Sequence, residues 1–143
     1  MTVLTKSIFD PAKEEDGYRI LITRYYPRGI SKNRFDEWVS VLSPSPKLLF
    51  DYKEGKVTWN EFTDRLLSEL RDETTVQEAL TALNELSNKT VLTLLCFERS
   101  GTPCHRHIIR ELIDRPEILE GAFESKDAYY HEGSAMQCHI ADQ

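Results

Sequence analysis

Two short runs of hydrophobic residues, each followed directly by charged residues, organise this chain. Residues 18–23 are apolar in their middle, and residues 90–97 form a second run that is long enough for one buried strand. Unbroken runs of this kind are typical of parallel strands that are covered on both faces. A shorter segment, residues 7–9, is interpreted as a further strand near the start of the chain.

Between the two runs, apolar residues recur at helical spacing. Thr58 and Glu61 form a predicted capping box that opens one helix. Thr75 and Glu78 form a second predicted capping box, which opens a helix that ends near Asn88. The strands and the helical faces together predict a buried core of Trp59, Phe62, Leu66, Leu80, Leu83, Leu92, Leu94 and Ile108.

Two more helices are expected from the same spacing. One covers residues 35–42, and the Ser-Pro-Ser-Pro segment at residues 43–46 ends it. The other follows the second apolar run and covers residues 103–113, with Thr102 as its N-cap and a proline in its first position.

Buried strands separated by helices predict an α/β fold. We expect a small, mainly parallel sheet of three to four strands flanked by helices, in a single layered domain over residues 1–113. The direction in which the first strand pairs stays open, because ten-residue connections are short for a parallel crossover. Residues 114–143 are interpreted as a C-terminal extension that is either docked or flexible.

Composition and charge narrow the classes of function. The 143 residues carry a net charge of −6, which argues against nucleic acid as a partner. No segment approaches the roughly 20 apolar residues of a membrane helix, so no membrane partner is expected. The first ten residues lack the apolar core of a signal peptide, and the three cysteines lack a disulfide spacing. We therefore expect a cytoplasmic protein with reduced thiols; nothing in the sequence indicates the oligomeric state or a cofactor.

Candidate chemistry collects between the second apolar run and the last helix. Glu98 and His105 are candidate catalytic residues for acid–base chemistry. Thr102, Cys104 and Arg106 are candidate ligand-binding residues, because free backbone N–H groups at a helix start bind anions. We expect a phosphate, sulfate or carboxylate to bind near residues 102–106.

Each of these side chains also has a purely structural interpretation. Helical spacing turns His105 toward the sheet, where it can be a buried histidine bonded to a carbonyl, and it places His107 on the outer face. Cys104 can be a small residue in the first helical turn. Neither cysteine fits a phosphatase signature, which needs an arginine six residues after the cysteine: Thr102 has that position after Cys96, and Arg110, which has it after Cys104, lies within the predicted helix. No metal site is predicted, because the pairs Cys104–His105 and Cys138–His139 lack the tight spacing of structural zinc ligands.

A second group of candidate ligand-binding residues follows the first apolar run. Arg24, Tyr25 and Arg28 leave that strand at the edge of the sheet where Glu98 is expected, if the two strands are parallel. The alternative is a surface loop in which Arg28 pairs with Asp36 or Glu37.

Three segments of the chain, within residues 18–32, 35–45 and 95–106, resemble the DUF488 family of uncharacterised proteins. The resemblance extends from about Lys6 to Ile113 and has Tyr26 where the family often has a tryptophan. It implies a compact α/β domain of bacteria and archaea whose biochemical role is not established. The positions that match the family pattern are Arg24, Pro27, Arg28, Gly29, Trp38, Glu98, Cys104, His105 and Arg106.

Three hypotheses for function follow. The first is an enzyme that acts on a small anionic compound, phosphorylated or nucleotide-like, at the carboxyl edge of the sheet. The second is a non-catalytic binding module for an anionic metabolite or a nucleic-acid end. The third is a structural or interaction domain in which the charged cluster only stabilises the fold.

Overall fold

A computed structural model describes residues 2–98 and 103–119 of the chain. Its strands are β1 (Val3–Ser7), β2 (Tyr18–Leu21), β3 (Glu37–Trp38) and β4 (Leu92–Cys96). Its α-helices are α1 (Pro46–Lys53), α2 (Trp59–Arg71), α3 (Thr74–Ser87) and α4 (His105–Asp114), and short 3₁₀ turns connect several of these elements.

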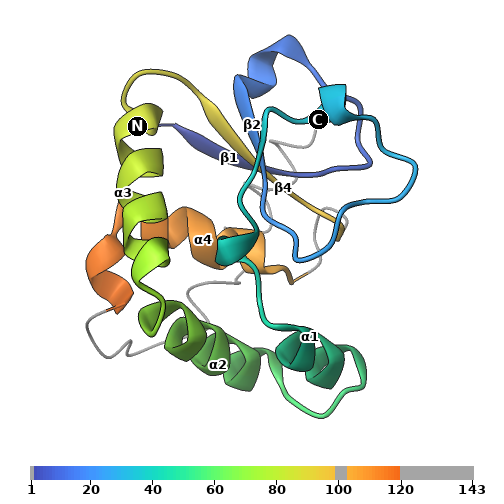
Figure 1. The fold of residues 1–143 in the computed structure, drawn as a ribbon, viewed down its shortest axis with the longest axis vertical. Coiled ribbons are helices and arrows are strands. Elements are labelled where there is room, and N and C mark those ends of the chain that lie inside the picture. The colour runs from blue at the N-terminus through green and yellow to red at the C-terminus, as the bar shows by residue number, and fades with distance from the viewer. Residues whose placement is uncertain (1, 99–102, 120–143) are drawn as a thin grey trace.

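The four strands form one parallel sheet in the order β1-β4-β2-β3 (Figure 1). The two apolar runs seen in the sequence are the central strands, and Leu21 of β2 lies in register with Leu95 of β4. The predicted α/β class and the parallel pairing of these two strands are confirmed. Since all strands run the same way, the residues that follow β2 and β4 meet at one edge of the sheet.

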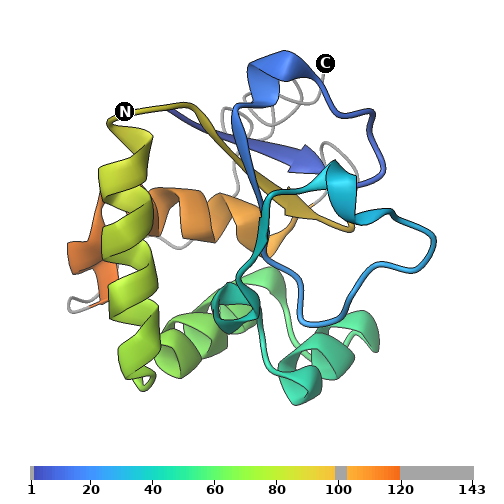
Figure 2. The ribbon, with the colours of Figure 1, turned by 45° about the horizontal axis from the view of Figure 1, so that its top comes forward.

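The helices cover one face of this sheet (Figure 2). Alternate residues of the strands point to this face, and Ile20 and Leu94 contact the apolar sides of α2, α3 and α4 there. On the opposite face, Leu21 and Leu95 form a smaller cluster with Ile8, Ile30, Phe35 and Phe97. The predicted core is confirmed, with Trp59 only partly buried at its margin.

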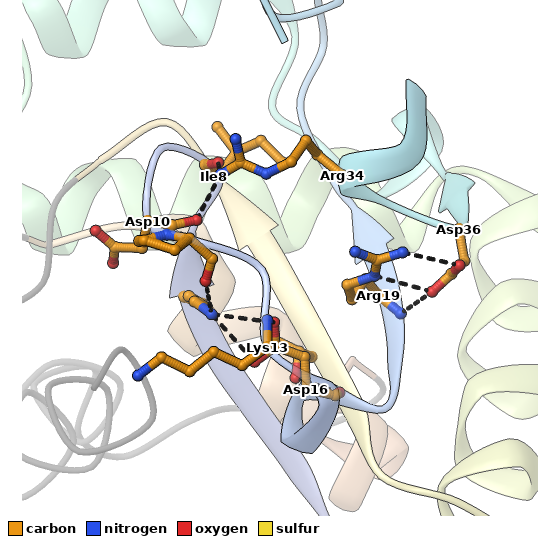
Figure 3. Close-up of polar contacts among 10 residues, drawn as sticks. Ile8, Asp10, Lys13, Asp16, Arg19, Arg34 and Asp36 are labelled. Carbon is orange, nitrogen blue, oxygen red and sulfur yellow. Dashed lines mark hydrogen bonds and ion pairs between the residues drawn. The ribbon is translucent and has the colours of Figure 1, made fainter. Parts of the chain in front are cut away.

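Hydrogen bonds and ion pairs join the loops to the strands on the second face of the sheet (Figure 3). Lys6 of β1 is 1% exposed, and its ammonium donates to the Asp16 carboxylate at 3.0 Å and to the Pro11 carbonyl at 2.6 Å. Arg34 donates to the carbonyls of Ile8 and Asp10, and Arg19 pairs with Asp36 at 3.2 Å (Figure 3). These contacts fasten the loops that follow β1 and β2 to the sheet.

The prediction of a helix over residues 35–42 is wrong. Glu37–Trp38 is instead the edge strand β3, because the Asp36 and Val39 amides donate to the Arg19 and Leu21 carbonyls of β2. Backbone bonds to a neighbouring strand have outweighed the helical spacing of the side chains.

Three further boundaries differ from the prediction. The first strand is Val3–Ser7 and not residues 7–9. Pro46 begins α1, with Ser45 as its N-cap, so the Ser-Pro-Ser-Pro segment opens a helix. Helix α3 begins at Thr74 with Glu73 as its N-cap and no side-chain cap, so the second capping box is wrong, whereas the Thr58–Glu61 box is confirmed.

The predicted C-terminal extension begins at Asp114, which is the last residue of α4. After α4 a 3₁₀ helix, Pro116–Leu119, places Ile118 and Leu119 in the main core. The remainder of the predicted extension, residues 120–143, lies outside the described residues, as do Cys138 and His139. Among the helices that the structure describes, none has the length and apolar character needed to cross a bilayer.

Candidate functional site

A small cavity of about 50 Å³ opens at the carboxyl ends of β2 and β4. Glu98 and His105 line it from the β4 side, and Arg24 and Tyr25 line it from the β2 side. Helix α1 contributes Lys53. Four of the predicted site residues therefore share one cavity, although they come from segments about 75 residues apart along the chain.

The residues that follow β2 have different surroundings. Arg24 donates to the carbonyls of Ser43 and Pro44 at 3.0 and 3.1 Å, so its guanidinium is held in place at the cavity. Tyr25 is 58% exposed at the cavity rim. Arg28 is exposed and does not line the cavity. The pairing of Arg28 with Asp36 or Glu37 is wrong, because Asp36 pairs with Arg19 and Glu37 accepts from the Tyr18 hydroxyl.

Helix α4 begins later than predicted. Its first residue is His105 and its N-cap is Cys104, which has an extended backbone with φ −151° and ψ 146°. Pro103 is therefore not helical, and Thr102, which lies outside the described residues, is not the N-cap. The extended Cys104 brings its thiol back toward the end of β4.

Two thiols, an imidazole and a carboxylate meet beneath the cavity. The Cys104 sulfur donates to Oε2 of Glu98 at 3.4 Å. Nδ1 of His105 is 3.8 Å from the sulfur of Cys104 and 3.8 Å from that of Cys96. Nε2 of His105 lies 2.6 Å from the Ile22 carbonyl and 3.6 Å from the Cys96 sulfur. His105 points toward the sheet, as the helical spacing predicts.

Burial and charge act in opposite directions within this cluster. Burial raises the pKa of Glu98 to about 6, with a further contribution from the Cys104 sulfur. Burial opposes ionisation of Cys104, but the hydrogen bond from Cys96 and the charge of His105 hold the pKa of Cys104 well below its usual range. Burial also opposes a charge on His105, yet its contacts with Cys104 and the Ile22 carbonyl raise its pKa. The cluster therefore favours a thiolate–imidazolium pair.

The pKa of the second thiol is shifted in the opposite direction. Cys96 is fully buried, and burial raises its pKa well above the usual range, with a further contribution from its contact with Cys104. Cys96 therefore remains a thiol where Cys104 ionises.

Arg106 and His107 lie deeper than the sequence indicates. Arg106 is fully buried and donates to the Glu98 carbonyl at 2.6 Å, so it supports the end of β4. His107 is predicted on the outer face of α4, and that prediction is wrong because the side chain is fully buried. Helix α4 packs against β1, β4 and α3.

Two residues at the carboxyl edge of the sheet were not identified as site residues from the sequence. Cys96 is the last residue of β4, and its place at the end of an apolar run, two residues before Glu98, is the signal that could have identified it. Lys53 is the last residue of α1. The Ser45–Pro46 pair that begins this helix is the sequence feature that could have located it, because proline is common at the first helical position.

A larger hollow of about 460 Å³ lies on the other side of Arg24. Its lining includes the carboxylates of Glu69, Asp72 and Glu73 and contains neither Glu98 nor His105. An acidic wall repels anions, so the smaller cavity is the better candidate site for an anionic ligand.

Comparison with known proteins places the chain in a family. The family DUF488-N3a, described as "Active DUF488-N3 subclade", matches residues 3–117. The uncharacterised protein YeaO of Escherichia coli K12 is 32% identical over 113 residues, which cover 78% of this chain and 96% of YeaO. The uncharacterised protein Rv3073c of Mycobacterium tuberculosis H37Rv is 28% identical over 109 residues, which cover 75% of this chain and 89% of Rv3073c. No solved structure matches the chain. The chain belongs to the DUF488 family.

Proposed function

We propose that this protein is an enzyme that acts on a small anionic compound bound at the carboxyl ends of β2 and β4. The lining of the cavity carries this proposal, because it combines the Glu98 carboxylate with the cations Arg24 and Lys53. The Glu98 carboxylate repels an anion, so it would weaken binding at a site that serves only to bind one. Its position beside two cations therefore supports a role in proton transfer.

Each residue has a defined role in this proposal. Lys53 and the fixed guanidinium of Arg24 attract the anionic group. Glu98 exchanges a proton with the bound compound. His105 is a positioning residue, because Nε2 is bonded to the Ile22 carbonyl and the ring nitrogens lie against the sulfurs of Cys96 and Cys104.

The cavity also limits the substrate. A volume of about 50 Å³ takes a carboxylate, a phosphate or a similarly small group, and the rest of a larger compound would extend past Tyr25. A reducing compartment such as the cytoplasm would keep Cys96 and Cys104 as thiols beneath it. The word "active" in the family description also supports an enzyme.

Thermal unfolding with a panel of phosphorylated metabolites, carboxylic acids and nucleotides tests the proposal. A compound at a hundredfold excess over its Kd should stabilise the protein by about 2.7 kcal/mol. Lys53→Met should reduce this shift. Lys89→Met, which removes another exposed cation away from the cavity, should leave the shift unchanged.

Turnover of the stabilising compound then separates catalysis from binding. We expect Glu98→Gln to lower turnover by about a hundredfold or more and to retain binding. Binding without turnover by the wild-type protein would instead identify a non-catalytic binding module. Full turnover by Glu98→Gln, or no stabilisation by any compound of the panel, would contradict the proposal.

A further inference from the structure

Three side chains with metal-binding atoms come together beneath the cavity. Cys96 ends β4, Cys104 caps α4 and His105 begins α4. Their ligand atoms all lie within 4.8 Å of one another, and all three side chains are buried. The sequence shows little sign of this group, because seven residues separate the two cysteines.

Two sulfur–nitrogen distances in this group are close to those of a tetrahedral metal site. Zinc–sulfur bonds of about 2.3 Å and zinc–nitrogen bonds of about 2.0–2.1 Å give a sulfur–nitrogen edge of about 3.5 Å. Nδ1 of His105 is 3.8 Å from the sulfur of Cys96 and 3.8 Å from that of Cys104. Each edge needs to shorten by only about 0.3 Å to reach the tetrahedral length.

The histidine already has the outer contact that zinc-binding histidines make. Since a carbonyl oxygen only accepts hydrogen bonds, the 2.6 Å contact with Ile22 places a proton on Nε2 of His105. When metal binding removes the second ring proton, the lone pair is on Nδ1, which lies 3.8 Å from each sulfur, while the Cys96 sulfur is also 3.6 Å from Nε2. A backbone carbonyl that holds the second ring nitrogen fixes the tautomer and the orientation of a ligating histidine.

The fourth position of the site faces the cavity. Oε2 of Glu98 lies 3.4 Å from the Cys104 sulfur, and Glu98 lines the cavity. Metal binding would displace the proton of Cys96. The two thiolates and the nearby carboxylate would then bring three negative charges into a buried place, which a divalent ion and the buried Arg106 guanidinium would balance. Two sulfurs and one imidazole favour zinc over magnesium or calcium.

We propose that Cys96, Cys104 and His105 bind one zinc ion, and that its fourth position opens toward the cavity beside Glu98. Three protein ligands and one side open to a cavity are typical of catalytic zinc sites. The proposal does not depend on the function proposed above, because the contacts of the three ligands with one another define the site.

Metal binding by the full-length protein tests this inference without any substrate. The reduced protein is stripped of metal, reloaded with Zn²⁺ or Co²⁺ and freed of excess ion. We expect about one ion per chain, a thiolate-to-cobalt charge-transfer absorption, and a higher melting temperature with Zn²⁺. Wild-type protein that retains no metal and shows no cobalt–thiolate absorption would overturn the proposal, whatever the variants do.

Single substitutions locate the site. Cys104→Ser and His105→Gln should each lower the affinity for Zn²⁺ by at least about tenfold, and circular dichroism shows whether they fold. Cys138→Ser, the matched control at the third cysteine, should keep the full metal content. Loss of metal from Cys138→Ser while Cys104→Ser retains it would overturn the assignment. An unchanged ligand response of Lys53→Met would count against the proposed function alone.

Discussion

At the scale of single residues, Gly17 controls how closely two strands approach. It precedes β2 with φ +66°, a conformation that side chains disfavour. A Cβ atom at this position would lie 2.3 Å from the Val91 carbonyl oxygen. That oxygen accepts from the Tyr18 amide at 2.9 Å, so the first bond between β2 and the start of β4 forms beside the glycine.

Gly17→Ala should therefore destabilise the protein more than Gly55→Ala does. Gly55 also has a positive φ, +72°, but a Cβ there meets nothing within 4 Å. We expect Gly55→Ala to cost about 1 kcal/mol from backbone strain. Gly17→Ala should cost about 1–3 kcal/mol more, because the added methyl group overlaps backbone. Urea unfolding measures both variants, and equal losses would contradict the close approach.

At the scale of elements, two neighbouring helices start in different ways. In α2 the Thr58 hydroxyl accepts from the Glu61 amide at 3.2 Å, and the Glu61 carboxylate accepts from the Thr58 amide at 2.9 Å. In α3 the N-cap is Glu73, and its side chain makes no capping bond. Thr75, which resembles a cap in the sequence, is already inside that helix.

Alanine substitutions should separate these two helix starts. Thr58→Ala should cost about 1 kcal/mol of unfolding free energy, because it leaves the Glu61 amide without its acceptor. Thr75→Ala should change stability by less than about 0.5 kcal/mol, because this exposed hydroxyl caps no backbone group. A loss at Thr75 as large as that at Thr58 would show that α3 starts at the capping box after all.

At the scale of the whole molecule, one carboxylate joins two helices below the sheet. Asp51 of α1 accepts from Arg65 of α2 at 2.8 Å and from Lys47 at 3.2 Å. The side chain of Asp51 is only 8% exposed. The hydrogen bond from Arg65 and the nearby Lys47 hold the pKa of Asp51 below its usual range. The folded state therefore prefers the ionised form more strongly than the unfolded state does.

This preference predicts a pH dependence of stability. Above the unfolded-state pKa of about 3.9, wild type should be more stable than Asp51→Asn, and the difference should not vary with pH. As the pH falls through the lower folded-state pKa of Asp51, the difference should decrease, because protonation removes the ion pair. Urea unfolding of both proteins between neutral and acidic pH measures it.

Glu78→Gln, which changes an exposed carboxylate in α3, is the control and should follow wild type throughout. An Asp51→Asn difference that grows on acidification would contradict the ion pair as its source.

The sequence by itself determined the features that depend on short-range interactions. The two apolar runs are the central strands because each buries both faces within its own few residues. The Thr58 capping box works because its partners lie three residues apart. The same local evidence placed Glu98 and Arg24 at one edge, because parallel strands end on the same side.

Tertiary structure decided the rest, through contacts between distant residues. Residues 35–42 have helical spacing, yet bonds to β2 make Glu37–Trp38 a strand. Lys53 reaches the cavity only because α1 packs beneath the sheet edge. Cys96 meets His105 because β4 ends where α4 begins and Cys104 stays extended between them. Such contacts depend on how whole helices and strands pack against one another. The local spacing of side chains carries no information about that packing.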